Sequence, residues 1–168
     1  MHANSNAYGT VTAAADGTYT VAFERELVDA PERVWKALTD PAEVRQWFTE
    51  MTLEPRPGGR VFLDFGEEGS AEGEILRWEP PHVLEHSWST GETTSRVRWE
   101  LEAAERGTRL TLRHTGLVAE ERHEYGAGWH GFLDRMRVYL AGETVWSTWD
   151  GFRDRVEEYR QRAGVSGA

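Results

Sequence analysis

Residues 30–41, which read APERVWKALTDP, decide the fold together with the QWF that follows at residues 46–48. Pro31 suits the first position of a helix, because the N–H that proline lacks would have no intrahelical partner there. The apolar residues after it recur at helical spacing, so the sequence predicts a short helix that ends at the Asp-Pro pair. Pro41 cannot continue that helix but can open a second one, whose apolar stripe includes the QWF. Two short helices are therefore expected inside a chain that is otherwise rich in strand sequence.

Strand sequence lies on both sides of these helices. From residue 19 to residue 27, apolar or aromatic side chains alternate with mostly polar ones, which predicts a first strand. Further strand-like runs cover residues 61–65, 71–78, 82–89, 95–102 and 109–114. Consecutive strands joined by tight turns predict an antiparallel meander. In the run 71–78 the alternation of polar and apolar residues is mixed, so either of two sets of alternate residues could face inward. These sets are Glu72, Glu74, Leu76 and Trp78, or Gly73, Ile75, Arg77 and Glu79.

The pattern changes from strand-like to helical at about residue 120. One face of this long helix carries Tyr125, Trp129, Leu133, Met136 and Leu140. The helix is expected to stop near Gly142, and its apolar face needs a sheet to cover. The tail repeats the pattern, with Val145, Trp149, Phe152, Val156 and Tyr159 on one stripe. The expected organisation is a flexible arm over residues 1–17, one domain over 18–142, a docked terminal helix over 143–162 and a flexible tail over 163–168.

The composition is that of one acidic domain. The chain has 168 residues, a formal net charge of -10 and no cysteine, so disulfides, thiolate metal sites and thiol nucleophiles are excluded. The charge repels phosphate backbones and anionic membranes, and no basic patch offsets it, so neither a nucleic acid nor a membrane is expected as a partner. The start of the chain lacks the pattern of a signal peptide, and no apolar stretch is long enough to span a bilayer. These features predict a cytoplasmic protein.

Six short motifs occur in an order that is specific for one fold. They are residues 30–48, PGG at 57–59, Gly73, PP at 80–81, GTRLTL at 107–112 and GW at 128–129. In this order and spacing the chain resembles the START-like, or SRPBCC, helix-grip superfamily, and more narrowly its branch of activator-of-heat-shock-ATPase homologues. The resemblance implies an α+β fold in which a curved antiparallel sheet wraps around a long C-terminal helix, with a cavity between them. It implies no particular chemistry, because folds of this kind serve lipid transfer, hormone binding, polyketide cyclisation and chaperone regulation.

The alternation of side chains along the strands indicates which residues face the expected cavity. In the run 82–89, the more apolar face carries His82, Leu84, His86 and Trp88. Side chains from two later strands, from the second short helix and from the long helix join them. The predicted ligand-binding residues are Trp47, Phe48, Phe65, Leu84, His86, Trp88, Val97, Trp99, Leu112, His114, Trp129, Leu133 and Met136. Such a lining suits a large, flat, unsaturated or aromatic ligand with His86 and His114 as polar anchors, although the same side chains would equally serve as an ordinary core.

Other chemistry finds little support in the sequence. His82 and His86 would be roughly 13 Å apart on one strand, too far for a shared metal ion, so no metal site is predicted. Residues 126–131, GAGWHG, match the letters of a dinucleotide fingerprint, but no strand leads into them and no alternating strand-helix-strand pattern surrounds them. We interpret them as glycines that let the long helix approach the sheet closely, or that loosen a gate over the cavity. No cofactor is expected, and no hydrolase or NTPase motif occurs.

The favoured function is binding and sequestration of a bulky hydrophobic small molecule of polyketide or enediyne type, without turnover. A resemblance to helix-grip proteins that protect the producers of enediyne antibiotics implies a sharper version, in which the protein is itself cleaved. Gly91 is the candidate cleavage position, because no side chain shields its Cα, although a turn glycine is expected there as well. Two alternatives stay open. One is a polyketide aromatase or cyclase that moves protons with Glu74, His86 or His114, and the other is a co-chaperone of a heat-shock ATPase.

Overall fold

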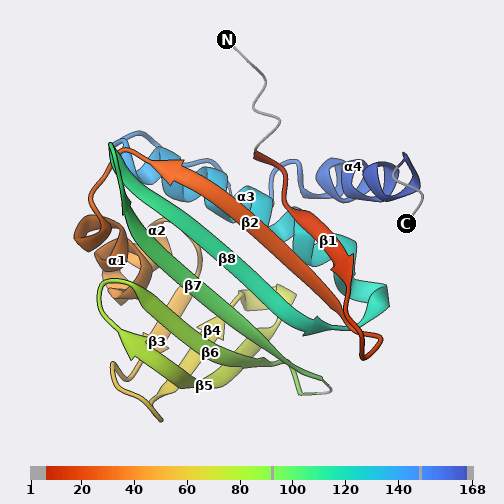
Figure 1. Cartoon of the computed structure of the whole chain (residues 1–168), viewed down its shortest axis with the longest axis horizontal. Helices are drawn as coiled ribbons and strands as arrows, with labels where there is room; N and C mark the ends of the chain where they lie inside the picture. The colour runs from red at the N-terminus through yellow and green to blue at the C-terminus, as the bar shows by residue number, and fades with distance from the viewer. Residues whose placement is uncertain (1–6, 92, 148, 166–168) are drawn as a thin grey trace.

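A single antiparallel sheet curves around one long helix (Figure 1). The computed structural model describes residues 7–91, 93–147 and 149–165, and within them the sheet has eight strands in the order β1-β2-β8-β7-β6-β5-β4-β3. The strands are β1 (Thr10–Ala13), β2 (Tyr19–Leu27), β3 (Glu50–Leu53), β4 (Arg60–Asp64), β5 (Ser70–Glu79), β6 (Val83–Ser89), β7 (Thr94–Ala104) and β8 (Gly107–Leu117). The helices are α1 (Pro31–Thr39), α2 (Pro41–Trp47), α3 (Arg122–Leu140) and α4 (Phe152–Val165), with the 3-10 helices η2 (Gly66–Glu68) and η3 (Ala119–Glu121). The predicted α+β helix-grip fold is confirmed.

The two short helices begin where the prolines require. Pro31 is the first residue of α1 and Pro41 the first residue of α2. Asp40 lies between them in an extended conformation, and its Oδ1 accepts a hydrogen bond of 3.0 Å from the backbone N–H of Ala42. This cap satisfies one of the free N–H groups at the start of α2. The two helices lie at one end of the curved sheet, where α1 contacts β7 (Figure 1).

The core lies between the concave face of the sheet and α3. The inward-facing residues of the three central strands are buried, as their alternation predicts. They are Leu84, His86 and Trp88 of β6, Val97, Trp99 and Leu101 of β7, and Leu110, Leu112 and His114 of β8. His82 does not belong to this face, because it precedes β6 in a turn, is exposed, and donates from Nδ1–H to the carbonyl of Leu101 at 2.8 Å.

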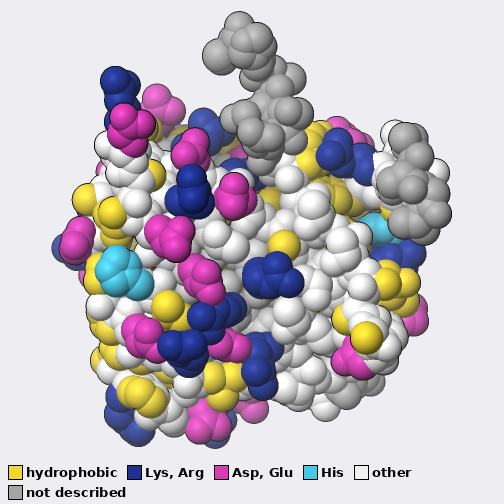
Figure 2. Space-filling model, viewed as in Figure 1, with side chains coloured by type: hydrophobic (Ala, Val, Ile, Leu, Met, Phe, Trp, Pro, Cys, Tyr) yellow, Lys and Arg dark blue, Asp and Glu magenta, His cyan; other side chains and the backbone are white. Residues whose placement is uncertain are grey.

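The convex face of the sheet is covered by charged side chains. Figure 2 shows both acidic and basic groups over the left part of this face, with several basic side chains together near its centre. Glu85 of β6, for example, accepts one hydrogen bond from Arg98 at 2.7 Å and lies 3.5 Å from Arg96. Pairs of this kind neutralise one another locally, although Arg98 of β7 also lies directly opposite Arg113 of β8.

Strand β5 contains a β-bulge that explains its mixed sequence period. The register with β6 shifts between Ile75 and Arg77, so Leu76 is the extra residue and its side chain is exposed. Ile75 is buried before the bulge, and Trp78 faces inward after it, where its ring contacts Trp35 at 5.1 Å between centroids. The inward face therefore changes from odd-numbered to even-numbered residues within one strand.

Strand β1 corrects the prediction of a flexible arm over residues 1–17. Residues 10–13 pair with the first half of β2 in an antiparallel hairpin. The turn is made by Gly17, whose φ is 89°, and by Asp16, whose Oδ1 accepts a 3.0 Å hydrogen bond from the N–H of Thr18. At the opposite edge of the sheet, β3 is a second short strand that the sequence pattern does not predict.

Helix α4 corrects the predicted bounds of the terminal helix. The chain from Gly142 to Gly151 is not helical where the structure describes it, so the helix begins at residue 152 rather than near 143. It continues to residue 165, into the segment that was expected to be a tail. Val156 and Tyr159 are buried where α4 packs against α3. Residues 1–6 of the expected arm and 166–168 of the expected tail lie outside the described residues.

The glycine-rich residues 126–131 lie inside α3, which begins four residues earlier, so they do not form a nucleotide-binding loop. They also do not serve contact with the sheet as expected. A Cβ on Gly126 would lie 3.1 Å from Cδ1 of Tyr159, so this glycine allows α4 to approach α3. None of the described helices is both long and apolar enough to cross a bilayer.

Candidate functional site

An aromatic pocket lies beside the first half of α3, where the ends of β4, β5 and β6 meet the start of α4. Its volume is about 260 Å³. It is lined by Phe48, Phe65, Glu68, Ser70, Ala71, Trp88, Thr90, Glu124, Tyr125, Gly128, Trp129, Phe132, Trp149 and Phe152. Eight of these fourteen residues are aromatic, and the exposed ones among them, including Glu68, Thr90 and Glu124, form the mouth. The walls therefore offer ring faces and edges to a ligand.

The aromatic walls are held by contact with one another. Phe48, at the end of α2, lies 4.6 Å from Phe132 of α3 between ring centroids. Trp88 of β6 lies 5.7 Å from Trp129 and 6.0 Å from Phe65. Such edge-on and tilted contacts are the favoured geometries of aromatic pairs and restrict ring movement. A ligand would meet a largely preformed surface.

A chain of hydrogen bonds fixes the two tryptophans of the inner wall. The indole N–H of Trp129 donates to Nδ1 of His114 at 3.0 Å. Nδ1 is therefore the acceptor of the ring, so Nε2 carries the proton and donates to Oγ of Ser95 at 2.7 Å. The hydroxyl of Ser95 donates in turn to the carbonyl of Trp88 at 3.3 Å. The indole N–H of Trp88 donates to the hydroxyl of Tyr125 at 3.0 Å.

His114 and His86 are neutral parts of the core. Burial, aided by the nearby His86, lowers the pKa of His114 from 6.5 to about 3. Burial also lowers the pKa of His86, whose Nδ1–H donates to the carbonyl of Ser87 at 2.8 Å. Both ring nitrogens of His114 are occupied and its side chain is inaccessible to solvent, so it has no site from which to exchange a proton with a ligand.

Tyr125 gives the pocket a polar group. Its hydroxyl accepts the hydrogen bond from Trp88 and donates none to any of the described residues. Burial raises its pKa above the usual 10, so the phenol stays protonated at neutral pH. The hydroxyl can therefore donate to a carbonyl, ether or hydroxyl oxygen of a ligand.

The pocket contains four of the thirteen residues predicted to bind a ligand. These are Phe48, Phe65, Trp88 and Trp129. The structure places the other nine in the packed core behind the pocket wall, and they are Trp47, Leu84, His86, Val97, Trp99, Leu112, His114, Leu133 and Met136. Strand alternation identifies the concave face but does not reveal how much of it is filled by packing.

Four aromatic residues of the pocket were not predicted to bind a ligand. Tyr125 could have been found, because it lies on the same predicted helix face as Trp129, one turn away. Phe132 lies three residues after Trp129 and gives a similar signal. Trp149 lies in the connection between α3 and α4, and Phe152 is the first residue of α4. The sequence alone does not indicate that these two residues complete the wall of the pocket.

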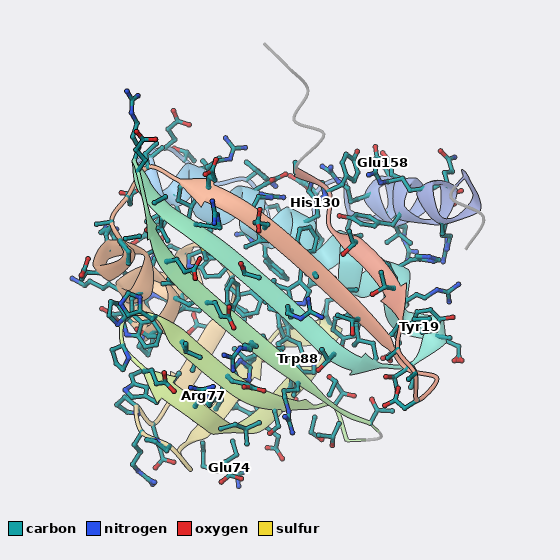
Figure 3. The ribbon with its side chains drawn as sticks, viewed as in Figure 1. Tyr19, Glu74, Arg77, Trp88, His130 and Glu158 are labelled. Carbon is teal, nitrogen blue, oxygen red and sulfur yellow. The ribbon has the colours of Figure 1, made fainter. Side chains whose placement is uncertain are left out.

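Glu74, the third residue considered for proton transfer, lies on the other side of the sheet. It is exposed on β5, and Figure 3 shows it at the outer margin of the sheet, away from Trp88. It faces outward because the inward positions before the bulge are odd-numbered. None of the three predicted proton-transfer residues is among the described residues that line the pocket.

Gly91 lies next to the mouth of the pocket, directly after the lining residue Thr90. Its φ is 99°, a conformation that favours glycine, and a Cβ built on it would meet nothing within 4 Å. The backbone requirement of the turn thus accounts for a glycine here, and the Cα is open to solvent. Within the part of the chain that the structure describes, no group of three His, Cys, Asp or Glu side chains could hold a metal ion.

Comparison with solved structures gives relatives over most of the chain. CalU16 from Micromonospora echinospora is 27% identical, with a TM-score of 0.75, over 91% of this chain and 94% of that one. The protein of gene BPP1335 from Bordetella parapertussis is 30% identical, with a TM-score of 0.72, over 96% of this chain and 95% of that one. DynU16, a protein in the dynemicin biosynthetic locus, is 29% identical, with a TM-score of 0.69, over 74% of this chain and 48% of that one.

Comparison with curated proteins gives no match. A family model described as Activator of Hsp90 ATPase homolog 1-like protein matches residues 30–141, which include both short helices and the whole of α3. The resemblance inferred from the short motifs is therefore confirmed, and the fold and the aromatic pocket are consistent with a ligand-binding role. The chain belongs to the Activator of Hsp90 ATPase homolog 1-like family.

Proposed function

We propose that this protein binds and sequesters a hydrophobic, aromatic small molecule of polyketide or enediyne type. The observation that carries the proposal is the pocket of about 260 Å³ with eight aromatic side chains among its lining residues. Pockets for small molecules are typically apolar, with a few polar groups that fix orientation, and Tyr125 is such a group here. DynU16 supports the ligand class, because its locus makes dynemicin, an enediyne.

The volume limits how much of a ligand the pocket can enclose. A dry protein cavity of about 150 Å³ is known to accept one benzene ring. A volume of about 260 Å³ therefore fits two fused rings. A larger polyketide or enediyne would insert one flat end between Trp88, Trp129 and Phe132 and leave the rest at the mouth.

Sequestration is favoured over the cyclase alternative by the position of the acid-base candidates. His114 has no free nitrogen, His86 lies in the core and Glu74 lies on the outer face. A co-chaperone would act through an outer surface such as the convex face, which carries both acidic and basic side chains (Figure 2) and not the aromatic pocket.

The test is a pair of matched glycine substitutions on α3. Gly128 lines the pocket and a Cβ on it would touch only Phe152, at 3.9 Å, so Gly128→Leu should fill the pocket without disturbing the helix. Gly131 lies outside this pocket and has nothing within 4 Å of a built Cβ, so Gly131→Leu is the control.

A panel of flat aromatic natural products that includes an enediyne would be titrated while the indole N–H signals are recorded by NMR. We expect saturable shifts of Trp88 and Trp129 in the native protein and the control, and at least about tenfold weaker binding in Gly128→Leu. Equal binding by both variants would place the ligand elsewhere.

Self-sacrifice is the sharper form of the proposal, and the exposed Cα of Gly91 beside the mouth supports it. A thiol-activated enediyne cyclises to an aryl diradical, which can take a hydrogen atom from this Cα. The carbon radical adds O2, and thiols reduce the peroxyl radical to a hydroperoxide and then to the α-hydroxyglycine, releasing water and forming a disulfide. The hydroxyglycine breaks at its N–Cα bond. One fragment ends as the carboxamide of Thr90, and the other begins with a glyoxylyl group on Glu92.

This step is tested with protein labelled with deuterated glycine, mixed with an activated enediyne, thiol and air. We expect two fragments with the masses of residues 1–90 as an amide and 92–168 with a glyoxylyl group, and deuterium in the aromatised product. Binding without fragments or deuterium transfer would leave sequestration in place and remove sacrifice.

A further inference from the structure

The charged residues of the aromatic pocket are all of one sign. Glu68 of η2 and Glu124 in the first turn of α3 are the only charged residues among the described lining, and both are exposed at the mouth. No arginine, lysine or histidine lines the pocket. No ion pair joins either glutamate to any residue in the described part of the chain. Two uncompensated carboxylates therefore lie at the entrance of an aromatic cavity.

The walls behind the mouth also favour positive charge. The indole N–H groups of Trp88 and Trp129 already donate to Tyr125 and to His114, so both rings offer a ligand their faces rather than a donor. The face of an indole carries negative potential and attracts a cation within about 6 Å. An anion entering the pocket would meet the hydroxyl of Tyr125, the exposed hydroxyls of Ser70 and Thr90, and two negative charges. Three neutral hydroxyls against two carboxylates would compensate little of the hydration that such a ligand loses.

We propose that the pocket selects planar aromatic ligands that carry an ammonium group, with the rings inside and the ammonium group between Glu68 and Glu124 at the mouth. This inference rests on the proposed binding function and specifies the ligand class of the same site. The rings supply the apolar contact and the ammonium group supplies the selectivity, because it gains from the carboxylates and from the indole faces together.

The test compares three ligands that share one ring system and differ in charge. Naphthylmethylamine is cationic at neutral pH, naphthylmethanol is neutral and naphthoate is anionic, and all three have the two fused rings that the volume allows. Affinities would be measured by calorimetric titration near neutral pH, with the indole signals of Trp88 and Trp129 to confirm the site. We expect the ammonium ligand to bind about tenfold more tightly than the carboxylate, with the alcohol between them.

Two double variants identify the source of the preference. Glu68→Gln with Glu124→Gln removes the carboxylates of the mouth and should bring the ammonium and the alcohol to within about twofold of each other. Glu67→Gln with Glu120→Gln is the matched control, because these exposed glutamates lie close by in sequence, do not line the pocket, and change the net charge equally. This control should keep the native preference.

The outcomes separate the inference from the function on which it rests. A carboxylate that binds as well as the ammonium ligand, or a preference that survives in the mouth variant, would overturn the inference and leave the binding function intact. Failure of all three ligands to bind would overturn both.

Discussion

His130 is a residue of α3 (Figure 3), and both of its ring nitrogens are engaged where α3 meets α4. The guanidinium of Arg155 donates to Nε2 at 2.8 Å, so Nδ1 carries the proton and donates to the hydroxyl of Tyr159 at 3.0 Å. That hydroxyl also accepts the N–H of Gly9 at 2.9 Å. One imidazole thus joins α3 to α4 and, through Tyr159, to the segment before β1. Only the neutral ring can make this set of bonds.

The neutral state of His130 and His114 makes the stability of the fold dependent on pH. Burial, followed by the charges of Arg155, Arg25 and Arg162, lowers the pKa of His130 to about 3, and burial lowers that of His114 to about 3. The unfolded chain binds a proton at each histidine below about pH 6.5, whereas the folded chain does not until about pH 3, so stability falls as the pH falls through this window. Between about pH 7.5 and pH 5, each histidine should cost about 2 kcal/mol of unfolding free energy.

Urea denaturation of His130→Gln checks this value. Glutamine can both donate and accept, and it does not titrate, so the difference in unfolding free energy between the two pH values should shrink by about 2 kcal/mol. His82→Gln, at an exposed histidine in a turn, is the matched control for the chemical change itself. An unchanged difference in His130→Gln would mean that this imidazole is charged in the native state.

At the scale of single residues, the sequence predicts the face of the sheet on which a side chain lies better than it predicts the hydrogen-bond partners of that side chain. Strand alternation places His86 and His114 on the concave face, and they do lie there. Their expected role as polar anchors of a ligand depends on free nitrogen atoms. The indole of Trp129 occupies Nδ1 of His114, and this partner comes from a helix fifteen residues further along the chain. A strand pattern contains no information about such a contact.

At the scale of whole elements, a glycine in α3 determines how closely α4 packs against that helix. Gly126 and Gly131 both lie inside α3, where alanine would normally add about 1 kcal/mol of stability. A Cβ at Gly131 meets nothing within 4 Å, so Gly131→Ala should be stabilising by about this amount. A Cβ at Gly126 would lie 3.1 Å from Tyr159, which its hydrogen bonds to Gly9 and His130 hold in place.

We therefore expect Gly126→Ala to be less stable than Gly131→Ala by about 1–3 kcal/mol, because the contact is overpacked. Denaturant unfolding measures the difference, and the indole signal of Trp149, next to Phe152, reports movement at the start of α4. Equal stability of the two variants would show that α4 shifts freely, and the docking described here would then be wrong.

Elements differ in how well the sequence predicts them, and length explains most of the difference. The long helix α3 and the central strands carry enough alternation to be recognised. The edge strands β1 and β3 have four residues each, too few for a pattern, and they form because β2 and β4 offer unpaired edges. The Asp16-Gly17 turn is the signal that could have revealed β1.

The size of the pocket is a property of the whole molecule. A concave sheet face with many aromatic residues predicts a broad cavity, but Trp47, Trp99 and Met136 fill most of the space between the sheet and α3. The aromatic pocket lies at one end, where the connection to α4 and the start of α4 supply the last wall. Packing density depends on how side chains from distant elements fit together, so the pattern of one element cannot reveal it.

The formal net charge of -10 acts on ligands over a distance that salt controls. The Debye length is about 20 Å at about 0.02 M salt, so the whole acidic protein attracts a cation, and only about 4 Å at about 0.5 M, so only adjacent charges act. We expect the affinity of naphthylmethylamine to fall several-fold between low and high salt and that of naphthylmethanol to stay constant.

A preference for the ammonium ligand that remains at high salt should come from the carboxylates of Glu68 and Glu124. It should persist in the Glu67→Gln, Glu120→Gln control and vanish in the mouth variant, although both have the same net charge. If the preference disappears at high salt in the native protein, it comes from the overall charge and not from the mouth.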